Sequence, residues 1–320
     1  MDVTELRPLS LGELLDRTFR LYRNNFWLFA GIMAVPSALS IPFTVLFFSS
    51  QSSAMAGVPP SPKLVAGMIL YGVFFFALFF AVYAVAIGAT TLAVSEIYLG
   101  QKITVRGAFG KVRGNFWRII GVVVLAMLRA YGMLILVATG MAIVIGISVG
   151  VMAAVGSGPS KVVFGIVLGV VMVLAYIAGI GLWILWSLRY AVSIPALLLE
   201  RVGVFAALRR SVLLTRGRRW QMLVTIFLCS IIAYVGVVVF QGPFFVTMMF
   251  SIRTGHVPEW VAYASAMSGA IGGAITGPVL LIALVLCYYD TRIRKEAFDL
   301  QFMMSSLDQP APVPNTGSPA

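Results

Sequence analysis

SLGELLDRTFRLYRNNFW, residues 10–27, is the stretch that decides the fold. On a helical wheel of about 3.6 residues per turn, its apolar and charged side chains fall on opposite faces, which predicts an amphipathic helix. Ser10 followed by Glu13 matches a capping box and marks the start of that helix. Because the residues from Phe26 onward form a long apolar run and no soluble core, we expect the helix to lie at a bilayer surface. Its apolar face comprises Leu11, Leu14, Leu15, Thr18, Phe19, Leu21 and Tyr22.

The composition of the whole chain indicates the class of protein. Of its 320 residues, 60% are hydrophobic and only 11% are charged, and the mean hydropathy is +1.00. Soluble globular domains carry about 25% charged residues. The composition therefore excludes a soluble globule and predicts an all-α, polytopic integral membrane protein.

Six apolar runs are long enough to cross a hydrocarbon core of ~30 Å. Several exceed the ~20 residues that a perpendicular helix needs, so we expect tilt, kinks or interfacial ends to take up the excess. Pro36 and Pro42 are expected to kink the first span, and the expected break points of the later spans are Pro195, Pro243 and Pro278. The predicted spans cover residues 26–48, 64–93, 118–154, 162–199, 221–250 and 260–287.

Glycines spaced four residues apart in three of these spans predict close helix contacts. Such stripes suit a monomeric bundle and an oligomer equally, so the sequence leaves the oligomeric state open. The stripes are Gly146 and Gly150, Gly165 and Gly169, and Gly269, Gly273 and Gly277.

The opening unit recurs twice along the chain. Asn115-Phe116-Trp117 repeats the ending Asn25-Phe26-Trp27, and a third unit ends at Trp220. Basic segments before spans are general in polytopic proteins, but the shared ending favours an internal repeat. We predict three repeats, at about residues 10–98, 102–199 and 203–300, each with a cytoplasmic amphipathic helix and a transmembrane hairpin. The later apolar stripes are Val105, Phe109, Val112 and Phe116, and Val204, Phe205, Leu208 and Val212, and the matching basic residues are Arg23, Arg113 and Arg216.

These repeats are expected to form a single transmembrane domain of residues 1–302. Residues 303–320 are rich in Pro and Ser and have no apolar period, which predicts a disordered cytoplasmic tail. The first apolar run is longer than the ~7–15 residues of a signal-peptide core, so we expect the first span to be retained.

Basic residues mark one side of the membrane. The segments before the first, third and fifth spans hold four, five and six Lys or Arg residues, and three more follow the last span. The opposite loops hold only Lys63, Lys161 and Arg253. The positive-inside rule therefore predicts that both termini face the cytoplasm. The net charge of +12 then forms one basic face against the anionic inner leaflet, so a nucleic acid partner is not expected.

Two arginines within apolar stretches, Arg129 and Arg189, are candidates for contact with an anion or a lipid head group. If the third span begins at Arg118, Arg129 lies ~16 Å deep, but if the interfacial helix extends further, Arg129 lies at the membrane boundary. Arg189 follows Trp183 and Trp186, a pattern typical of an interfacial aromatic belt. The full candidate set is Arg129, Arg189, Arg209, Arg210 and Arg216.

Three acidic residues stand where the even-numbered spans end, and basic residues follow each of them. An acid at a helix C-terminus opposes the helix dipole, so we expect a compensating cation nearby. We predict a cytoplasmic ring of ion pairs that joins the repeats. Its members are Glu96, Glu200, Asp290, Arg292 and Arg294.

The sequence offers few groups for catalysis or for metal binding. Cys229 and Cys287 lie in apolar segments, and the only histidine, His256, stands in a loop without Cys or Asp neighbours. No phosphate-binding loop, HExxH motif or nucleophile elbow occurs in the sequence. We therefore expect no catalytic residue, no metal and no cofactor. The predicted spans also lack the Asp, Glu and His residues that ion-coupled transporters carry there.

Two stretches resemble a known family: RPLSLGELLD at residues 7–16, with Phe19 and Tyr22, and the closing segment from Tyr288 to Leu300. They are similar to the bacterial membrane domain attached to glycerophosphoryl diester phosphodiesterases, and to its stand-alone relatives of unknown function. The resemblance implies a multi-pass protein of the bacterial plasma membrane but no activity, because about twenty residues follow where a catalytic barrel takes ~250. Further matching positions are Glu200, Ala207, Arg210, Ser211, Leu214, Trp220, Asp290, Arg292, Arg294, Lys295 and Glu296.

Together these patterns favour a non-enzymatic accessory or scaffold protein of the bacterial envelope, whose basic face binds anionic membrane lipids or a partner protein. The alternative is a passive transporter or channel for lipid-derived or small polar solutes, in which Arg129 attracts an anion.

Overall fold

The computed structural model describes residues 9–55, 62–98, 100–154, 159–254 and 259–296, and these ranges contain helices but no strand. His256 and the predicted tail, residues 303–320, lie outside the described residues. The elements are α1 (Leu11–Asn24), α2 (Phe26–Met55), α3 (Pro62–Tyr98), α4 (Val105–Arg113), α5 (Phe116–Ala154), α6 (Pro159–Ser187), η2 (Leu188–Tyr190), α7 (Ser193–Leu199), α8 (Val204–Thr215), α9 (Arg219–Thr254) and α10 (Glu259–Glu296).

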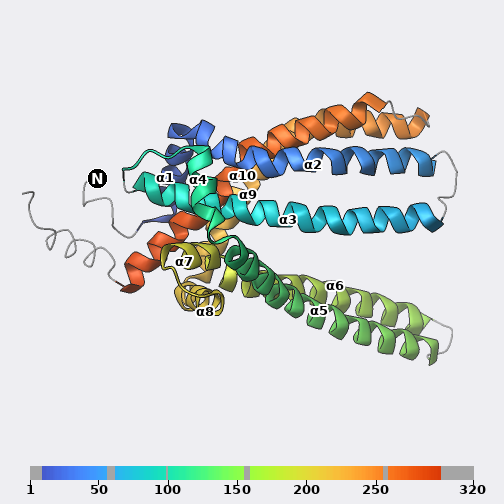
Figure 1. The fold of residues 1–320 in the computed structure, drawn as a ribbon. Coiled ribbons are helices and arrows are strands. Elements are labelled where there is room, and N and C mark those ends of the chain that lie inside the picture. The colour runs from blue at the N-terminus through green and yellow to red at the C-terminus, as the bar shows by residue number, and fades with distance from the viewer. Residues whose placement is uncertain (1–8, 56–61, 99, 155–158, 255–258, 297–320) are drawn as a thin grey trace, which may run out of the picture.

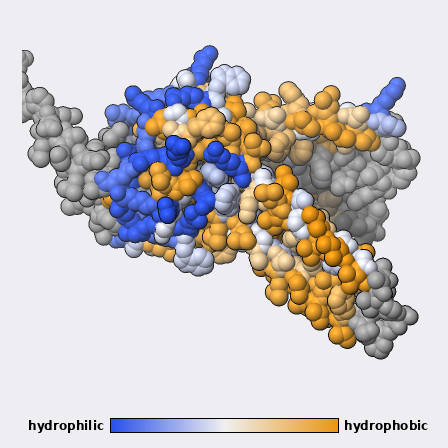
Figure 2. Space-filling view, turned by 90° about the horizontal axis from the view of Figure 1, so that it is seen from below, coloured by the Kyte–Doolittle hydropathy of each residue, from blue (hydrophilic) through white to orange (hydrophobic). Residues whose placement is uncertain are grey.

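Six of these helices, α2, α3, α5, α6, α9 and α10, are long and apolar enough to cross a membrane, which confirms the predicted all-α polytopic fold. The short helices α1, α4, α7 and α8 gather at one end of the molecule (Figure 1). Hydrophilic side chains cover the same end, whereas hydrophobic ones cover the long hairpins (Figure 2). We call this end the polar end. Each of α1, α4 and α8 precedes a pair of long helices along the chain.

Side-chain caps explain where two of the short helices begin. The Ser10 hydroxyl accepts a hydrogen bond from the Glu13 backbone N–H (3.3 Å), and the Glu13 carboxylate accepts one from the Ser10 N–H (2.8 Å), so the predicted capping box is confirmed. Thr104 caps α4 by accepting from the Gly107 N–H at 3.2 Å.

The buried face of α8 includes Leu208 of the predicted apolar stripe but not Phe205. Phe205 is 69% exposed, whereas Ala207 and Ser211 are fully buried. The reason is a close approach to η2, in which the Ser211 hydroxyl donates to the Arg189 carbonyl oxygen at 2.7 Å. Small side chains permit this approach, and the larger Phe205 and Leu213 therefore face outward.

Prolines do not interrupt the long helices. The helices α9 and α10 continue through Pro243 and Pro278, so the breaks expected there are wrong, and α2 continues through Pro36 and Pro42. Pro195 lies in the first turn of α7, where its missing N–H costs no helical hydrogen bond. The stretch 162–199 is divided, because α6 ends at Ser187 and the chain continues through η2 into α7. The prolines inside unbroken helices are Pro36, Pro42, Pro243 and Pro278.

The helix α10 is central. Of its apolar window, 56% is buried, against 6% for those of α3, α5 and α6. Glycines let its neighbours approach: a Cβ on Gly277 would lie 2.8 Å from Met33 of α2, and one on Gly269 would lie 2.3 Å from Gln241 of α9. The predicted contact along this stripe is therefore confirmed. Gly146, Gly150 and Gly169 make no such contact within the chain, since no described atom lies within 4 Å of their Cβ positions.

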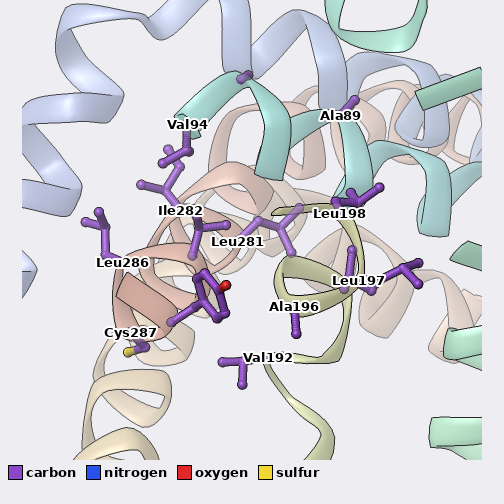
Figure 3. Packing of buried hydrophobic residues seen from close by; sticks show 14 of the residues in the cluster. Ala89, Val94, Val192, Ala196, Leu197, Leu198, Leu281, Ile282, Leu286 and Cys287 are labelled. Atoms are coloured by element: carbon purple, nitrogen blue, oxygen red, sulfur yellow. The ribbon is translucent and has the colours of Figure 1, made fainter. Parts of the chain in front are cut away.

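The largest hydrophobic core lies where α3, α7 and α10 meet (Figure 3). This core connects segments that are distant in sequence and places the end of α10 beside α7. The labelled members are Ala89 and Val94 of α3, Val192, Ala196, Leu197 and Leu198 in and before α7, and Leu281, Ile282, Leu286 and Cys287 of α10.

The α5–α6 hairpin leans away from the other long helices (Figure 1). It is joined to them at its base, where α5 packs against α3, α7 and α8. Within the hairpin, a Cβ on Gly179 would lie 2.7 Å from Val137, and the Trp183 indole N–H donates to the Ala130 carbonyl oxygen at 3.0 Å. Most of the hairpin surface is therefore open and apolar.

Replacing Gly236 by Ala tests the packing of α9 on α10. The new Cβ would lie 2.3 Å from Thr276 Cγ2, and Thr276 is held in place because its hydroxyl donates to the Gly272 carbonyl oxygen at 2.9 Å. We expect Gly236→Ala to lower the free energy of unfolding by about 1–3 kcal/mol, measured by thermal unfolding in detergent. The control Gly140→Ala, in open space on α5, should be neutral or slightly stabilising. Equal stability of the two variants would contradict the close packing of α9 against α10 at Gly236.

Candidate functional site

Glu200, which directly follows α7, is the centre of a group of charged side chains. It accepts hydrogen bonds from Arg210 Nε of α8 at 2.7 Å and from the Tyr288 hydroxyl of α10 at 2.8 Å. Arg292 Nε lies 4.0 Å from the Glu200 carboxylate and 3.1 Å from the Glu296 carboxylate. Arg210 also pairs with Glu296. We call Glu200, Arg210, Arg292 and Glu296 the four-charge cluster, in which two carboxylates balance two guanidinium groups.

Arg210 is compensated within this cluster. Burial by itself lowers the pKa of its guanidinium, but the hydrogen bonds and charges of Glu200 and Glu296 outweigh burial and raise that pKa. Arg210 therefore stays charged, and its charge is already neutralised by the protein.

Further contacts fix α8 against the rest of the polar end. Lys295 Nζ of α10 donates to the carbonyl oxygens of Leu213 and Arg216, both at 2.6 Å. Carbonyls at a helix C-terminus lack a partner within the helix, so Lys295 stabilises this end of α8. Ahead of α8, Arg118 Nη2 of α5 donates to the Val202 carbonyl oxygen at 2.9 Å.

Asp290 and Arg294 of α10 hold the chain ahead of α1. The Leu9 N–H donates to Asp290 Oδ1 at 2.8 Å, and Arg294 Nη2 donates to the Leu9 carbonyl oxygen at 2.6 Å. Arg294 Nε in turn donates to both oxygens of Asp290, at 2.9 and 3.0 Å. We call these three residues the Leu9 clamp. Its carboxylate is buried, with 3% of the Asp290 side chain exposed.

Tyr22 fixes the other end of α1. Its hydroxyl donates to the Ile275 carbonyl oxygen of α10 at 2.5 Å. Pro278 follows three residues later, and a proline inside a helix loosens the hydrogen bonds of the preceding turn, which leaves carbonyls there available. Burial raises the pKa of Tyr22 to about 12. The hydroxyl therefore keeps its proton and remains a donor at any physiological pH.

The predicted ring residues lie in three groups among the described residues. Glu200 and Arg292 meet in the four-charge cluster, Asp290 and Arg294 meet in the Leu9 clamp, and Glu96 of α3 pairs separately with Lys111 of α4 at 2.6 Å. The residues predicted to form a ring of ion pairs are thus observed in three local links, each of which connects different parts of the chain. Sequence reasoning missed the roles of Lys111, Tyr288, Lys295 and Glu296; of these, Glu296 was detectable as the i+4 partner of Arg292.

A groove with a volume of about 750 Å³ lies between α5 and α8. Three arginines, Arg129, Arg209 and Arg210, line it together with apolar side chains. Arg210 belongs to the four-charge cluster, but within the described ranges neither Arg129 nor Arg209 lies in an ion pair. We call this site the α5–α8 groove. Its apolar lining is Val202, Phe205, Ala206, Leu208, Val212 and Leu213.

Several aromatic side chains lie near Arg129. The Arg129 guanidinium lies 6.0 Å from the ring centre of Tyr190, and the ring centres of Tyr131 and Trp183 are 6.0 Å apart. Such belts are typical of the membrane–water interface. The part of α5 after Arg129 has about 25 residues, or ~37 Å, which is enough to cross the hydrocarbon core by itself. This geometry favours the boundary position for Arg129 over the deep one.

The other two candidate arginines lie outside the groove lining. Arg189 stacks on Trp186, with its guanidinium 4.1 Å from the ring centre. Its Nε and the Trp186 Nε1 are buried, and no described residue accepts a hydrogen bond from either atom. Arg216 is exposed at the end of α8. The structure therefore brings together Arg129, Arg209 and Arg210 and separates Arg189 and Arg216 from them.

Comparison of the chain with family models, with curated proteins and with solved structures finds no match. In the described part of the chain, no group of three or more His, Cys, Asp or Glu side chains is placed to hold a metal ion. The geometry of the polar end is therefore the basis for a functional proposal.

Replacing Glu200 by Gln tests the four-charge cluster. The substitution keeps the shape of the side chain but leaves Arg210 and Arg292 facing one carboxylate, and the Glu200 side chain is only 10% exposed. We expect Glu200→Gln to lower the free energy of unfolding by about 2–3 kcal/mol, measured by thermal or chemical unfolding in detergent.

The control is Asp16→Asn, which removes the same charge from a pair with Arg20 whose side chains are 65% and 64% exposed. This variant should lose no more than about 0.5 kcal/mol. Equal losses in the two variants would mean that the cluster contributes no more than a surface pair.

Proposed function

We propose that this protein is a non-enzymatic accessory or scaffold protein of a bacterial plasma membrane, with both termini in the cytoplasm and a basic face that binds anionic lipid head groups. The observation that carries the proposal is the division of its surface into apolar hairpins and one polar end (Figure 2). A protein divided in this way places its charged end at the membrane–water boundary.

The polar end carries exposed cations on all three short basic helices. In an inner leaflet rich in anionic lipid, each such side chain near the surface contributes ~1 kcal/mol of attraction. By contrast, Lys63 lies at the opposite end of the long helices. The exposed cations of these helices are Arg20 and Arg23 of α1, Arg106, Lys111 and Arg113 of α4, and Arg209 of α8.

A fixed arrangement of the short helices supports a scaffold role. The Leu9 clamp and Tyr22 hold α1 on α10, the Glu96–Lys111 pair holds α4 on α3, and the four-charge cluster holds α8 on α10. Buried ion pairs specify one arrangement, because each partner left alone would be an uncompensated charge. The basic face is thereby a shaped surface on which lipids or a partner protein can dock.

We also propose kinship with the membrane domain attached to glycerophosphoryl diester phosphodiesterases, in a form built from three repeats. In support, the residues that carry the resemblance come from three distant parts of the chain and contact one another: Leu9 with Asp290, and Glu200 with Arg210 and Tyr288. A shared motif is expected to conserve such contacts, because each residue depends on its partner.

Lipid selectivity tests the proposed function. We expect purified protein in nanodiscs of mixed phosphatidylglycerol and phosphatidylcholine to enrich the anionic lipid several-fold over the bulk, measured by mass spectrometry of the retained lipids. Combining Arg20→Gln, Arg23→Gln, Arg106→Gln and Arg113→Gln should abolish most of this enrichment, since each charge is worth ~1 kcal/mol. The matched control Lys63→Gln should leave it unchanged.

Two results would argue against this function. The first is an equal share of both lipids around the wild-type protein. The second is solute-specific flux through liposomes that disappears in Arg129→Leu, which would favour the transporter alternative.

A further inference from the structure

We infer that the α5–α8 groove is a binding site for one phosphomonoester lipid, with Arg129 and Arg209 on the phosphate and the apolar lining against the acyl chains. This inference rests on the proposed function and deepens it. The proposed function concerns attraction over the whole basic face, whereas the groove is one site with one occupant.

The balance of charge in the groove points to a dianion. Glu200 and Glu296 neutralise Arg210, so the uncompensated charge of the lining comes from Arg129 and Arg209. A phosphomonoester carries about −1.5 to −2 charges near neutral pH, whereas a phosphodiester carries about −1. Two guanidinium groups therefore match a phosphomonoester head group. Charge-assisted hydrogen bonds from arginine to phosphate oxygens also strengthen this contact.

Aromatic residues hold Arg129 and its neighbour Ala130 in position. Its guanidinium lies 6.0 Å from the ring centre of Tyr190, and its neighbour Ala130 accepts a hydrogen bond from the Trp183 indole at 3.0 Å. Both contacts hold Arg129 and the adjoining turn of α5 in place at this side of the groove. A cation held on an aromatic face loses less conformational freedom when it binds an anion.

The apolar lining indicates a lipid as the source of the phosphate. Phe205 and Leu213 are 69% and 54% exposed, although they stand on α8, outside the six apolar spans. Water makes such exposure unfavourable, at roughly 25 cal/mol per Å² of apolar surface. Acyl chains that run from the head-group level along α5 would cover these side chains. A free phosphate ion would leave them exposed.

The test measures lipid binding by native mass spectrometry of the full chain in detergent, with phosphatidic acid and phosphatidylglycerol of equal chain length as probes. We expect one phosphatidic acid to bind about tenfold or more tightly than phosphatidylglycerol. The double variant Arg129→Gln, Arg209→Gln should abolish this preference, because each charged hydrogen bond is worth about tenfold. The control Lys63→Gln, at the opposite end of the long helices, should keep it.

A second arm separates the two sources of phosphate. Inorganic phosphate is added as a competitor, and Phe205→Gln, Leu213→Gln removes the apolar lining while keeping both arginines. Arg129, Arg209, Phe205 and Leu213 are all exposed, so both double variants are expected to unfold at the melting temperature of the wild-type protein. Weaker binding of phosphatidic acid in this variant, without efficient competition by millimolar phosphate, supports a lipid site. Unchanged lipid binding together with efficient competition would assign the site to free phosphate and overturn the inference.

The inference and the proposed function fail differently. Equal binding of the two lipids, with the groove variant no worse than its control, would remove the groove site while leaving general enrichment of anionic lipid intact. Loss of all preference for anionic over zwitterionic lipid would remove both.

Discussion

The pairing of Glu200 with Arg210 is the contact on which the geometry of the polar end depends. A carboxylate with 10% of its side chain exposed loses most of its hydration, and only close cations and hydrogen-bond donors compensate that loss. Those partners come from α8 and α10, so the charge can be satisfied only when both helices are in place. Once α8 is fixed, Ala207 faces inward, and Phe205 and Arg209 face outward as lining of the α5–α8 groove. The groove is thus a consequence of satisfying one buried charge.

The long helices use two different kinds of packing. Lipid tails are as apolar as leucine, so association of helices within a bilayer requires close fit and hydrogen bonds. The α9–α10 pair has both a close fit and hydrogen bonds. Gly236 packs against Thr276, and Gln241 and Ser265 exchange hydrogen bonds. In α5, no described atom lies close to the Cβ positions of Gly146 and Gly150, and the hairpin is positioned mainly from its base. The groove, which Arg129 of α5 lines, therefore lies beside the least enclosed pair of spans.

Local and compositional features were predictable from the sequence, whereas features that depend on a partner were not. The membrane class and the capping box at Ser10 follow from composition and from residues three apart, and the structure confirms both. Hydropathy did not reveal the division of stretch 162–199, because the residues after Ser187 are still apolar. The wheel placed Phe205 and Leu208 on one apolar stripe, but it could not show that Leu208 is buried while Phe205 is 69% exposed, because a wheel shows which face is apolar but not which face has room for a neighbour. Glycine spacing likewise shows where contact is permitted, not where it occurs.

The same reasoning explains why counting arginines predicted the site only in part. Five arginines were candidates in the sequence, but Glu200 after α7, Glu296 of α10 and the aromatic ring of Trp186 determine which of them remain available. Arg210 is held by Glu200 and Glu296, and Arg189 is stacked on Trp186. If every cation of the basic face were paired with a carboxylate, the face would attract anionic lipid only weakly. If the face had no carboxylates, its helices would have no ion pairs to fix their arrangement. The uncompensated Arg129 and Arg209 lie beside a cluster that is itself neutral. The location of an anion site on this face is therefore determined by its few carboxylates more than by its many cations.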